Sequence, residues 1–197
     1  MAHTLIVYFS AEGSTHQLAC AIRDGAAAYG GASLLRLEPR HIVDGRYAPP
    51  AMAASAESLR RADAVIFGSP TYMGGPAAQF KAFADAGSAY WRGQPWTDKV
   101  AAGFTIGSSL NGDQQGTLSY FATLAAQHGM LWCGLDLPGG KHIDDLNRLG
   151  CQLGLCAHSA DGSLHPADLA TARHLGARAA RVADRLRRNA LLEENAP

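Results

Sequence analysis

The chain has little charge, and the charge that it has is balanced. Its 197 residues include 17 basic and 17 acidic side chains, so charged residues make up only 17% of the total, against about 25% in an average protein. This balance leaves no broad positive field, and we expect no nucleic-acid partner. A hydrophobic content of 47% excludes a disordered chain.

Long apolar segments are also missing. No run approaches the roughly 18 residues of a membrane helix, so we expect no membrane partner. The amino terminus, MAHTLIVYFS, does not have the form of a signal peptide. Cys20, Cys133, Cys151 and Cys156 form neither a CxxC pair nor a zinc-binding spacing with histidine. We therefore expect a cytoplasmic protein with reduced thiols and no metal.

Strands and helices are predicted to alternate along the whole chain. Apolar runs without interruption indicate strands that are buried on both faces, and segments with helical spacing separate them. Such alternation predicts an α/β protein with a parallel sheet between two layers of helices. The length favours a single domain, residues 1–190, followed by a short tail, 191–197. The expected strands are 5–9, 33–37, 64–68, 100–106 and 130–135, and the expected helices are 18–29, a short one within 39–58, 76–87, 115–128 and one from Pro166.

Ligands of such sheets bind beyond the carboxyl ends of the strands, which directs attention to three loops. The first loop, 10–15, carries Ser10, Glu12, Gly13, Ser14 and Thr15 before a helix. Its hydroxyls and free amides suit one phosphate group, although it is neither a dinucleotide motif nor a P-loop. The alternative is a helix cap, because Ser14 and the glutamine three residues later fit a capping box.

The second and third loops suit a flat ligand. Two prolines and adjacent glycines in the second loop allow close approach to the backbone. The third loop is rich in small polar residues and has no nucleophile–base pair. Chemistry in such a site is left to a cofactor, and one phosphate plus one flat ring indicates FMN. The candidate residues are Pro70, Thr71, Tyr72, Met73 and Gly74 in the second loop, and Gly107, Ser108, Ser109, Leu110, Asn111 and Gly112 in the third.

Several motifs in order resemble the flavodoxin-like NAD(P)H:quinone oxidoreductases of the WrbA type. The first loop, S-A-E-G-S-T, is similar to the flavodoxin phosphate loop. The other motifs are F-G-S-P-T-Y-M-G-G from Phe67, F-x-D-x-G-x-x-x-W ending at Trp91, A-x-Q-H-G-M ending at Met130, and the segment D-G-S-L-H-P-A-D-L-A-T-A-R-H-L-G from Asp161. The resemblance implies a flavodoxin-like doubly wound sheet of five strands in the order 2-1-3-4-5.

The resemblance also implies roles for the site residues. The first loop would hold the FMN phosphate, the second loop one edge of the isoalloxazine, and the third loop its other edge and pyrimidine side. Trp91 would flank the open flavin face, where Tyr72 helps to shape the pocket for nicotinamide and quinone. His128 matches an active-site histidine, but it ends a helix that starts at the ligand edge. It would therefore serve a neighbouring subunit, or it is a histidine stabilised at a helix C-terminus.

Three positions depart from the family pattern. Glu12 stands where relatives carry threonine or tyrosine, and a carboxylate beside a phosphate is unfavourable. The tip Y-M-G-G replaces R-F-G-N, and S-S-L-N-G-D replaces T-G-T-x-x-G-G-Q. We expect flavin binding to survive these changes, whereas the choice between NADH and NADPH, and the acceptor, stay open.

The sequence therefore predicts an FMN-dependent enzyme that passes a hydride from NADH or NADPH to the flavin and two electrons to a quinone. A homodimer or homotetramer is expected, with 136–166 as a candidate for subunit contacts. One alternative is a flavodoxin-type one-electron carrier, which the neutral charge disfavours because carriers dock through strong charge. The other is a flavin-binding regulatory protein with little turnover, for which Glu12 is the main argument.

Overall fold

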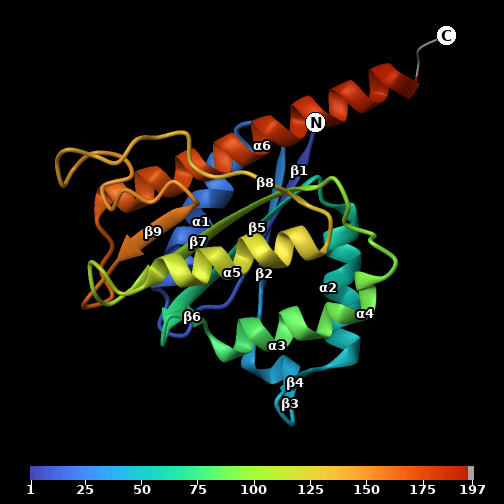
Figure 1. Ribbon diagram of the computed structural model, residues 1–197, viewed down its shortest axis with the longest axis horizontal. Helices are drawn as coiled ribbons and strands as arrows, with labels where there is room; N and C mark the ends of the chain where they lie inside the picture. Colours follow the sequence, from blue (N-terminus) through green and yellow to red (C-terminus); the bar gives the residue numbers. More distant parts are fainter. Residues whose placement is uncertain (195–197) are drawn as a thin grey trace.

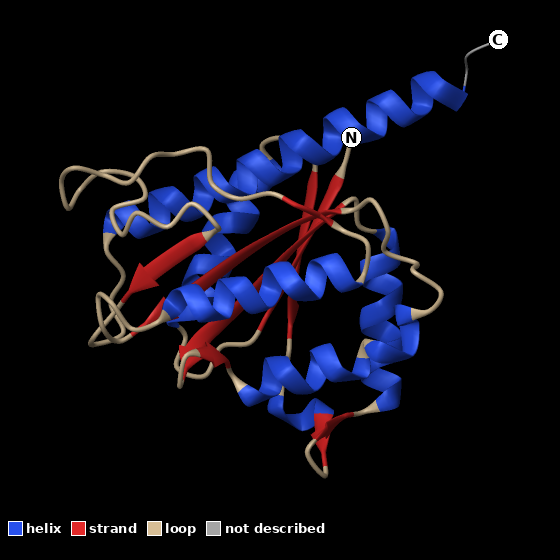
Figure 2. Ribbon diagram, viewed as in Figure 1, coloured by secondary structure: helices blue, strands red, loops and turns tan. Residues whose placement is uncertain are grey.

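A twisted parallel sheet lies between two layers of helices (Figures 1 and 2). The computed structural model describes residues 1–194, with side chains through residue 189. Every neighbouring pair of long strands is parallel, as expected for strands joined by helical crossovers. Across the sheet the order is β2 (Gly31–Arg36), β1 (His3–Tyr8), β5 (Ala64–Tyr72), β7 (Val100–Gly107) and β8 (Leu131–Trp132), with β9 (Leu155–His158) also on β7.

Each face of the sheet has its own hydrophobic core. Alternate residues of β1 point to opposite faces: Val7 joins one core and Ile6 the other. The core around Ile6 is covered by α1 (Ser14–Ala27) and α6 (Pro166–Glu194). The opposite core is covered by α2 (Pro49–Arg61), α3 (Ala78–Ala86) and α5 (Gln114–Gln127). No described helix combines the length and the apolar composition that crossing a membrane requires.

The fifth position of the sheet differs from the prediction of one strand at 130–135. β8 is only two residues long and pairs with the start of β7, whereas β9 pairs with the end of β7. The intervening residues, 133–154, form an insertion that leaves the sheet and returns to it. The segment 136–166 is therefore not a loop throughout, because it contains β9. A four-residue strand inside a stretch rich in glycine and polar residues gives no periodic signal.

Smaller differences concern element boundaries. α1 ends at Ala27, two residues before the predicted end at 29, and β2 begins at Gly31, two residues before the predicted start at 33. Pro76 pairs with β5 as part of β6 (Gly75–Pro76), and α3 begins two residues later. The connection 39–58 contains η1 (Pro39–His41), the hairpin of β3 (Ile42–Val43) and β4 (Arg46–Tyr47), and most of α2. After α3 comes one further short helix, α4 (Ser88–Trp91).

α1 and α6 touch backbone to backbone. A Cβ atom added at Gly25 would overlap the carbonyl oxygen of Arg173, and one added at Gly176 would overlap that of Ile22. Because any larger side chain would separate the helices, the two glycines set the distance between them. This packing fixes the C-terminal half of α1 against α6.

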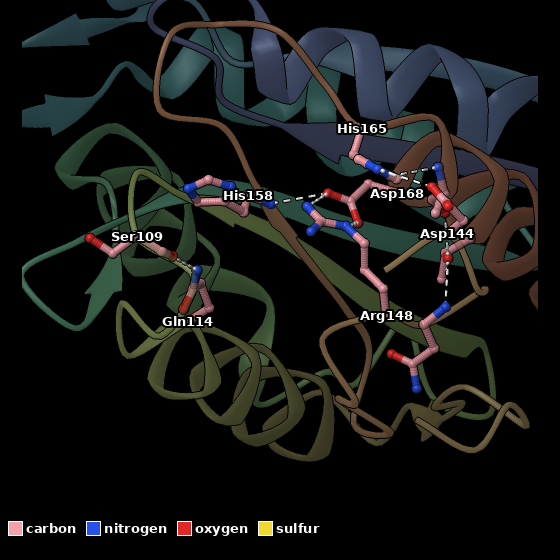
Figure 3. Close-up of polar contacts among 10 residues, drawn as sticks. Ser109, Gln114, Asp144, Arg148, His158, His165 and Asp168 are labelled. Carbon is pink, nitrogen blue, oxygen red and sulfur yellow. Dashed lines mark hydrogen bonds and ion pairs between the residues drawn. The ribbon is translucent and has the colours of Figure 1, made fainter. Parts of the chain in front are cut away.

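A buried ion pair ties the insertion to the start of α6 (Figure 3). Arg148 makes a two-pronged contact with Asp168, both bonds being 2.7 Å, and both side chains are less than 5% exposed. Asp168 also accepts a hydrogen bond from the backbone of His158, at the end of β9, at 3.2 Å. The pair therefore fixes the return of the insertion to the sheet.

Candidate functional site

The three predicted loops meet at the carboxyl edge of the sheet. They line two adjoining hollows that share Thr71, Gly107 and Ser108. The first hollow is also lined by Ala11, Glu12, Ser14, Thr15, Pro70, Tyr72, Ile106 and Ser159. The second is also lined by Met73, Gly74, Ser109, Gly112 and Asp113. Leu110 and Asn111 lie in the third loop but line neither hollow, and both are exposed.

The first loop is shaped as an anion cradle. Gly13 precedes α1 with a φ of +102°, a conformation that favours glycine. The buried Ser10 hydroxyl accepts hydrogen bonds from the amides of Gly13 and His16, each at 3.2 Å. The amides of Ser14 and Thr15 have no partner within the described residues and face the ligand edge at the positive end of the helix dipole. A phosphate satisfies such amides.

The capping-box interpretation of Ser14 is wrong. Gly13 is the N-cap, no side chain caps the helix from that position, and Ser14 is already helical. The hydroxyl that pairs with the first-turn amides comes instead from Ser10, outside the helix. Ser14 is consequently available to a ligand in the first hollow.

The charges around the cradle are mixed. Glu12 is exposed and lines the first hollow. Sequence reasoning missed a compensating cation at the end of β2: Arg36 donates to the Ser10 carbonyl at 3.2 Å and lies 3.5 Å from Glu38. A guanidinium this close to the loop offsets part of the repulsion between the Glu12 carboxylate and a bound anion. No periodicity in the sequence identifies Arg36, because only the pairing of β2 with β1 brings it to Ser10.

The second loop is held in place by hydrogen bonds among three threonine hydroxyls. Thr105 donates to the Ser69 carbonyl at 2.7 Å, so it accepts from Thr71, also at 2.7 Å. Thr71 in turn accepts from Thr117 of α5 at 2.8 Å. The hydroxyl proton of Thr71 is thus used inside the protein, and this residue offers a ligand its backbone and methyl group.

The tip of the second loop is a tight hairpin. Tyr72 pairs with Gly75 across a two-residue turn in which Met73 and Gly74 have φ values of +50° and +78°. Two positive φ values are the mark of a type I′ turn. Met73 is fully exposed and Tyr72 half-exposed. The carbonyl of Gly74 lies against Gly116 of α5, where no Cβ would fit, so the hairpin is seated on that helix.

The third loop owes its shape to a buried glutamine (Figure 3). The side-chain amide of Gln114 donates to the Ser109 carbonyl at 2.8 Å, and its oxygen accepts from the Gly112 amide at 2.7 Å. Gln114 is not among the candidate residues that the sequence indicated. Ser159 was missed altogether: it follows β9, and its amide donates to the Gly107 carbonyl at 3.1 Å.

Trp91 and His128 lie away from the loop site in the folded molecule. With Tyr120 they line a separate hollow at the opposite end of α5, a helix of 14 residues, or about 21 Å at 1.5 Å per residue. Within one chain, therefore, Trp91 and Tyr72 do not share a pocket. Trp91 is half-exposed, whereas His128 is buried with its ring 4.4 Å from that of Trp96. Burial lowers the pKa of His128, so its imidazole is neutral near neutral pH.

The loop site binds and orients; it does not carry acid–base chemistry of its own. Glu12 and Asp113 are the titratable carboxyls of its lining, and both are exposed. The unpaired amides of the first loop suit a phosphate, and the exposed hairpin and the polar third loop suit a flat ring. Together they fit FMN bound at the switch point of a doubly wound sheet. Fold and site together define a flavoprotein of the flavodoxin type.

Comparisons with known proteins agree with this class. The family model described as NADPH-dependent FMN reductase matches residues 5–134. Flavodoxin FldP of Pseudomonas aeruginosa is 38% identical over 94% of this chain and 99% of its own length. An NAD(P)H dehydrogenase (quinone) of Archaeoglobus fulgidus is 32% identical over 94% of this chain and all of its own. A solved structure of a flavodoxin, WrbA-like protein from Agrobacterium tumefaciens is 40% identical, with a TM-score of 0.73 over 94% of this chain and 99% of that one.

The chain belongs to the NADPH-dependent FMN reductase family, and the resemblance to WrbA-type proteins is confirmed. It is an oxidoreductase whose cofactor is FMN and whose electron donor is NADH or NADPH. The predicted fold class is also confirmed, with the fifth strand divided into β8 and β9.

Proposed function

We propose that this protein is an NAD(P)H:quinone oxidoreductase that acts as a homodimer or homotetramer in the cytoplasm. Bound FMN would supply the redox chemistry, which is transfer of a hydride from the nicotinamide and of two electrons to a quinone. The protein contributes binding and orientation. The relative from Archaeoglobus fulgidus, which is described as an NAD(P)H dehydrogenase (quinone), supports this proposal.

Each loop has one task in this proposal. The amides of Ser14 and Thr15 would hold the phosphate, in a loop shaped by Ser10 and Gly13. The Met73–Gly74 hairpin would border one edge of the ring, and the loop shaped by Gln114 would hold the other edge. The observation that carries the proposal is the convergence of these loops on one edge of the sheet without an acid–base pair.

Trp91 acts on a neighbouring subunit in this proposal, whereas His128 has a supporting role within its own chain. Their hollow lies at the end of α5 remote from the loops of the same chain. The exposed indole of Trp91 provides a flat apolar surface that a second copy can place over its flavin. His128, buried and neutral, supports the Trp96 ring beside that surface instead of transferring protons.

A one-electron carrier is the competing function, since one similar protein is named a flavodoxin. Carriers dock on their partners through a strong charge of one sign. The formal net charge of this chain is zero, which favours an enzyme that acts on small molecules.

The test uses FMN-loaded protein under anaerobic conditions. Bleaching of the flavin absorbance by NADH or NADPH, followed by full reoxidation with one equivalent of benzoquinone, is the expected result. Steady-state turnover should be much faster with benzoquinone than with cytochrome c, a one-electron acceptor. Fast reduction of cytochrome c and slow reduction by both nicotinamide nucleotides would instead establish a carrier.

A further inference from the structure

The first hollow contains a hydroxyl that the protein itself does not use. Ser159 lines this hollow, yet its Oγ is buried and has no hydrogen-bond partner in the part of the chain that the structure describes. Native structures leave few buried polar atoms unpaired, because each lost hydrogen bond destabilises the folded state. Such an atom on the wall of a ligand site indicates that a ligand completes its bonding.

Two neighbouring hydroxyls are already engaged in hydrogen bonds within the protein. Ser10 accepts two amide hydrogen bonds, and Thr71 lies in the hydroxyl chain between Thr105 and Thr117. The other buried side-chain atoms without partners belong to residues that do not line either hollow: Thr4, Trp96 and His128. Ser159 is thus distinguished by being both unpaired and at the site.

The backbone of Ser159 is held on two sides. Its amide donates to the Gly107 carbonyl of the third loop at 3.1 Å. The preceding residue, His158, donates to Asp168 at 3.2 Å, and Asp168 is fixed by Arg148 (Figure 3). Rotation about the single χ1 bond of Ser159 is then sufficient to direct its hydroxyl toward a ligand.

We propose that Ser159 is a fourth cofactor-binding element and that its hydroxyl binds the ribityl chain of FMN. Ser159 shares the first hollow with Ser14 and Thr15 of the phosphate cradle, but it reaches that hollow from the third-loop side, through Gly107. It is absent from the second hollow, where Met73 and Gly74 border the ring. The part of FMN between phosphate and ring is a polyol, whose hydroxyls pair readily with a serine hydroxyl.

The test measures the dissociation constants of three flavins for Ser159→Ala and wild type by fluorescence titration. FMN and riboflavin should both bind roughly threefold to tenfold more weakly to the variant, the equivalent of one hydrogen bond. Lumiflavin, which has the ring without the ribityl chain, should bind equally to both proteins. Ser159→Thr, which keeps a hydroxyl, should recover part of the loss, and Ser163→Ala in the same exposed loop is the matched control.

The other outcomes overturn the proposal in different ways. A loss confined to FMN would assign Ser159 to the phosphate, an equal loss for all three flavins would assign it to the ring, and no loss would remove it from the site. Urea unfolding of the flavin-free variants separates a structural role: because the Oγ is unpaired, its removal should not lower the midpoint. A wild type that binds no flavin at all would refute the cofactor assignment, on which this inference depends.

Discussion

Ser10 shapes the first loop through two oxygen atoms, its hydroxyl and its carbonyl. Its hydroxyl accepts from the amides of Gly13 and His16, and Arg36 donates to its carbonyl. The loop is therefore shaped before any ligand arrives, and binding does not have to order it. Single side chains of this kind, Gln114 in the third loop being the other, set the geometry of the site.

Ser10→Ala should weaken FMN binding about tenfold or more, because two amides lose their common acceptor, at about 1 kcal/mol each. Fluorescence titration with FMN measures the loss. Ser58→Ala removes an exposed hydroxyl that is bonded only to its own helix, and this control should bind FMN as the wild type does. An unchanged affinity in Ser10→Ala would show that the loop keeps its shape without this oxygen.

His128 should make stability depend on pH. Its pKa is lowered by burial in the folded state, so the unfolded chain binds more protons in the window below the ordinary value of about 6.5. The free energy of unfolding should therefore fall as the pH falls from about 7 to about 5. His128→Gln should show a shallower decline in urea titrations across this range. His142→Gln, at an exposed position, should follow the wild type, and parallel curves for all three would contradict the buried neutral imidazole.

Helices and strands are joined here by contacts that tolerate little change. α1 and α6 meet at glycines, and the insertion 133–154 is anchored by the buried pair of Arg148 and Asp168. The first contact fixes the C-terminal half of α1, and the second lies beside β9 at the ligand edge. Stability and binding are therefore expected to change together when the second contact is altered.

Gly176→Ala should destabilise the protein although alanine is the better helix former by about 1 kcal/mol. The new methyl group would overlap the Ile22 carbonyl of α1, and overpacking of this kind costs about 1–3 kcal/mol. Urea denaturation provides the measurement. Gly93→Ala adds a methyl group where nothing lies within 4 Å and should leave the midpoint unchanged. A more stable Gly176→Ala would mean that the two helices can separate freely.

Arg148→Met should lower the free energy of unfolding by about 3–5 kcal/mol, because it leaves the Asp168 carboxylate buried and unpaired. Replacing Asp168 by leucine in addition should restore only part of this loss, since the His158 amide still has no acceptor. Lys81→Met breaks an exposed pair with Asp85 and should change stability by less than about 1 kcal/mol. Equal effects of Arg148→Met and Lys81→Met would contradict a dominant role of burial.

The proposed function requires two surfaces of the molecule that lie at opposite ends of α5. The loop site lies at one end, and Trp91 stands exposed at the other. One chain cannot bring them together, because the helix between them is rigid and about 21 Å long. The proposed homo-oligomer resolves this separation through a second copy.

Co-expression of two defective chains tests this arrangement. A chain that lacks the cradle, Gly13→Val, and a chain that lacks the indole, Trp91→Ala, should each have low quinone reductase activity. Mixed oligomers should recover activity well above the mean of the two, because an intact loop site then meets an intact Trp91. Sedimentation should show a dimer or tetramer. Activity equal to the mean would place Trp91 outside the reaction of its neighbour.

The sequence by itself determined the alternation of elements, the three loops and the nature of the ligand. Apolar runs such as 64–68 are local signals of buried parallel strands, and a small polar loop before a helix is a local signal of an anion site. Gly13, Ser14 and Thr15 could be assigned for this reason. The family resemblance added Trp91 and His128, and the length of the predicted helix placed His128 far from the ligand edge.

Tertiary structure alone decided which distant residues complete the site. The pairing of β2 with β1 brings Arg36 to Ser10. The return of the chain to the sheet as β9, after the insertion 133–154, brings Ser159 to Gly107. Such contacts join residues between 26 and 52 positions apart in the chain, so no local pattern encodes them. Burial, which leaves the Ser159 hydroxyl unpaired and the His128 imidazole neutral, is likewise a property of packing, because it depends on every element that surrounds the group.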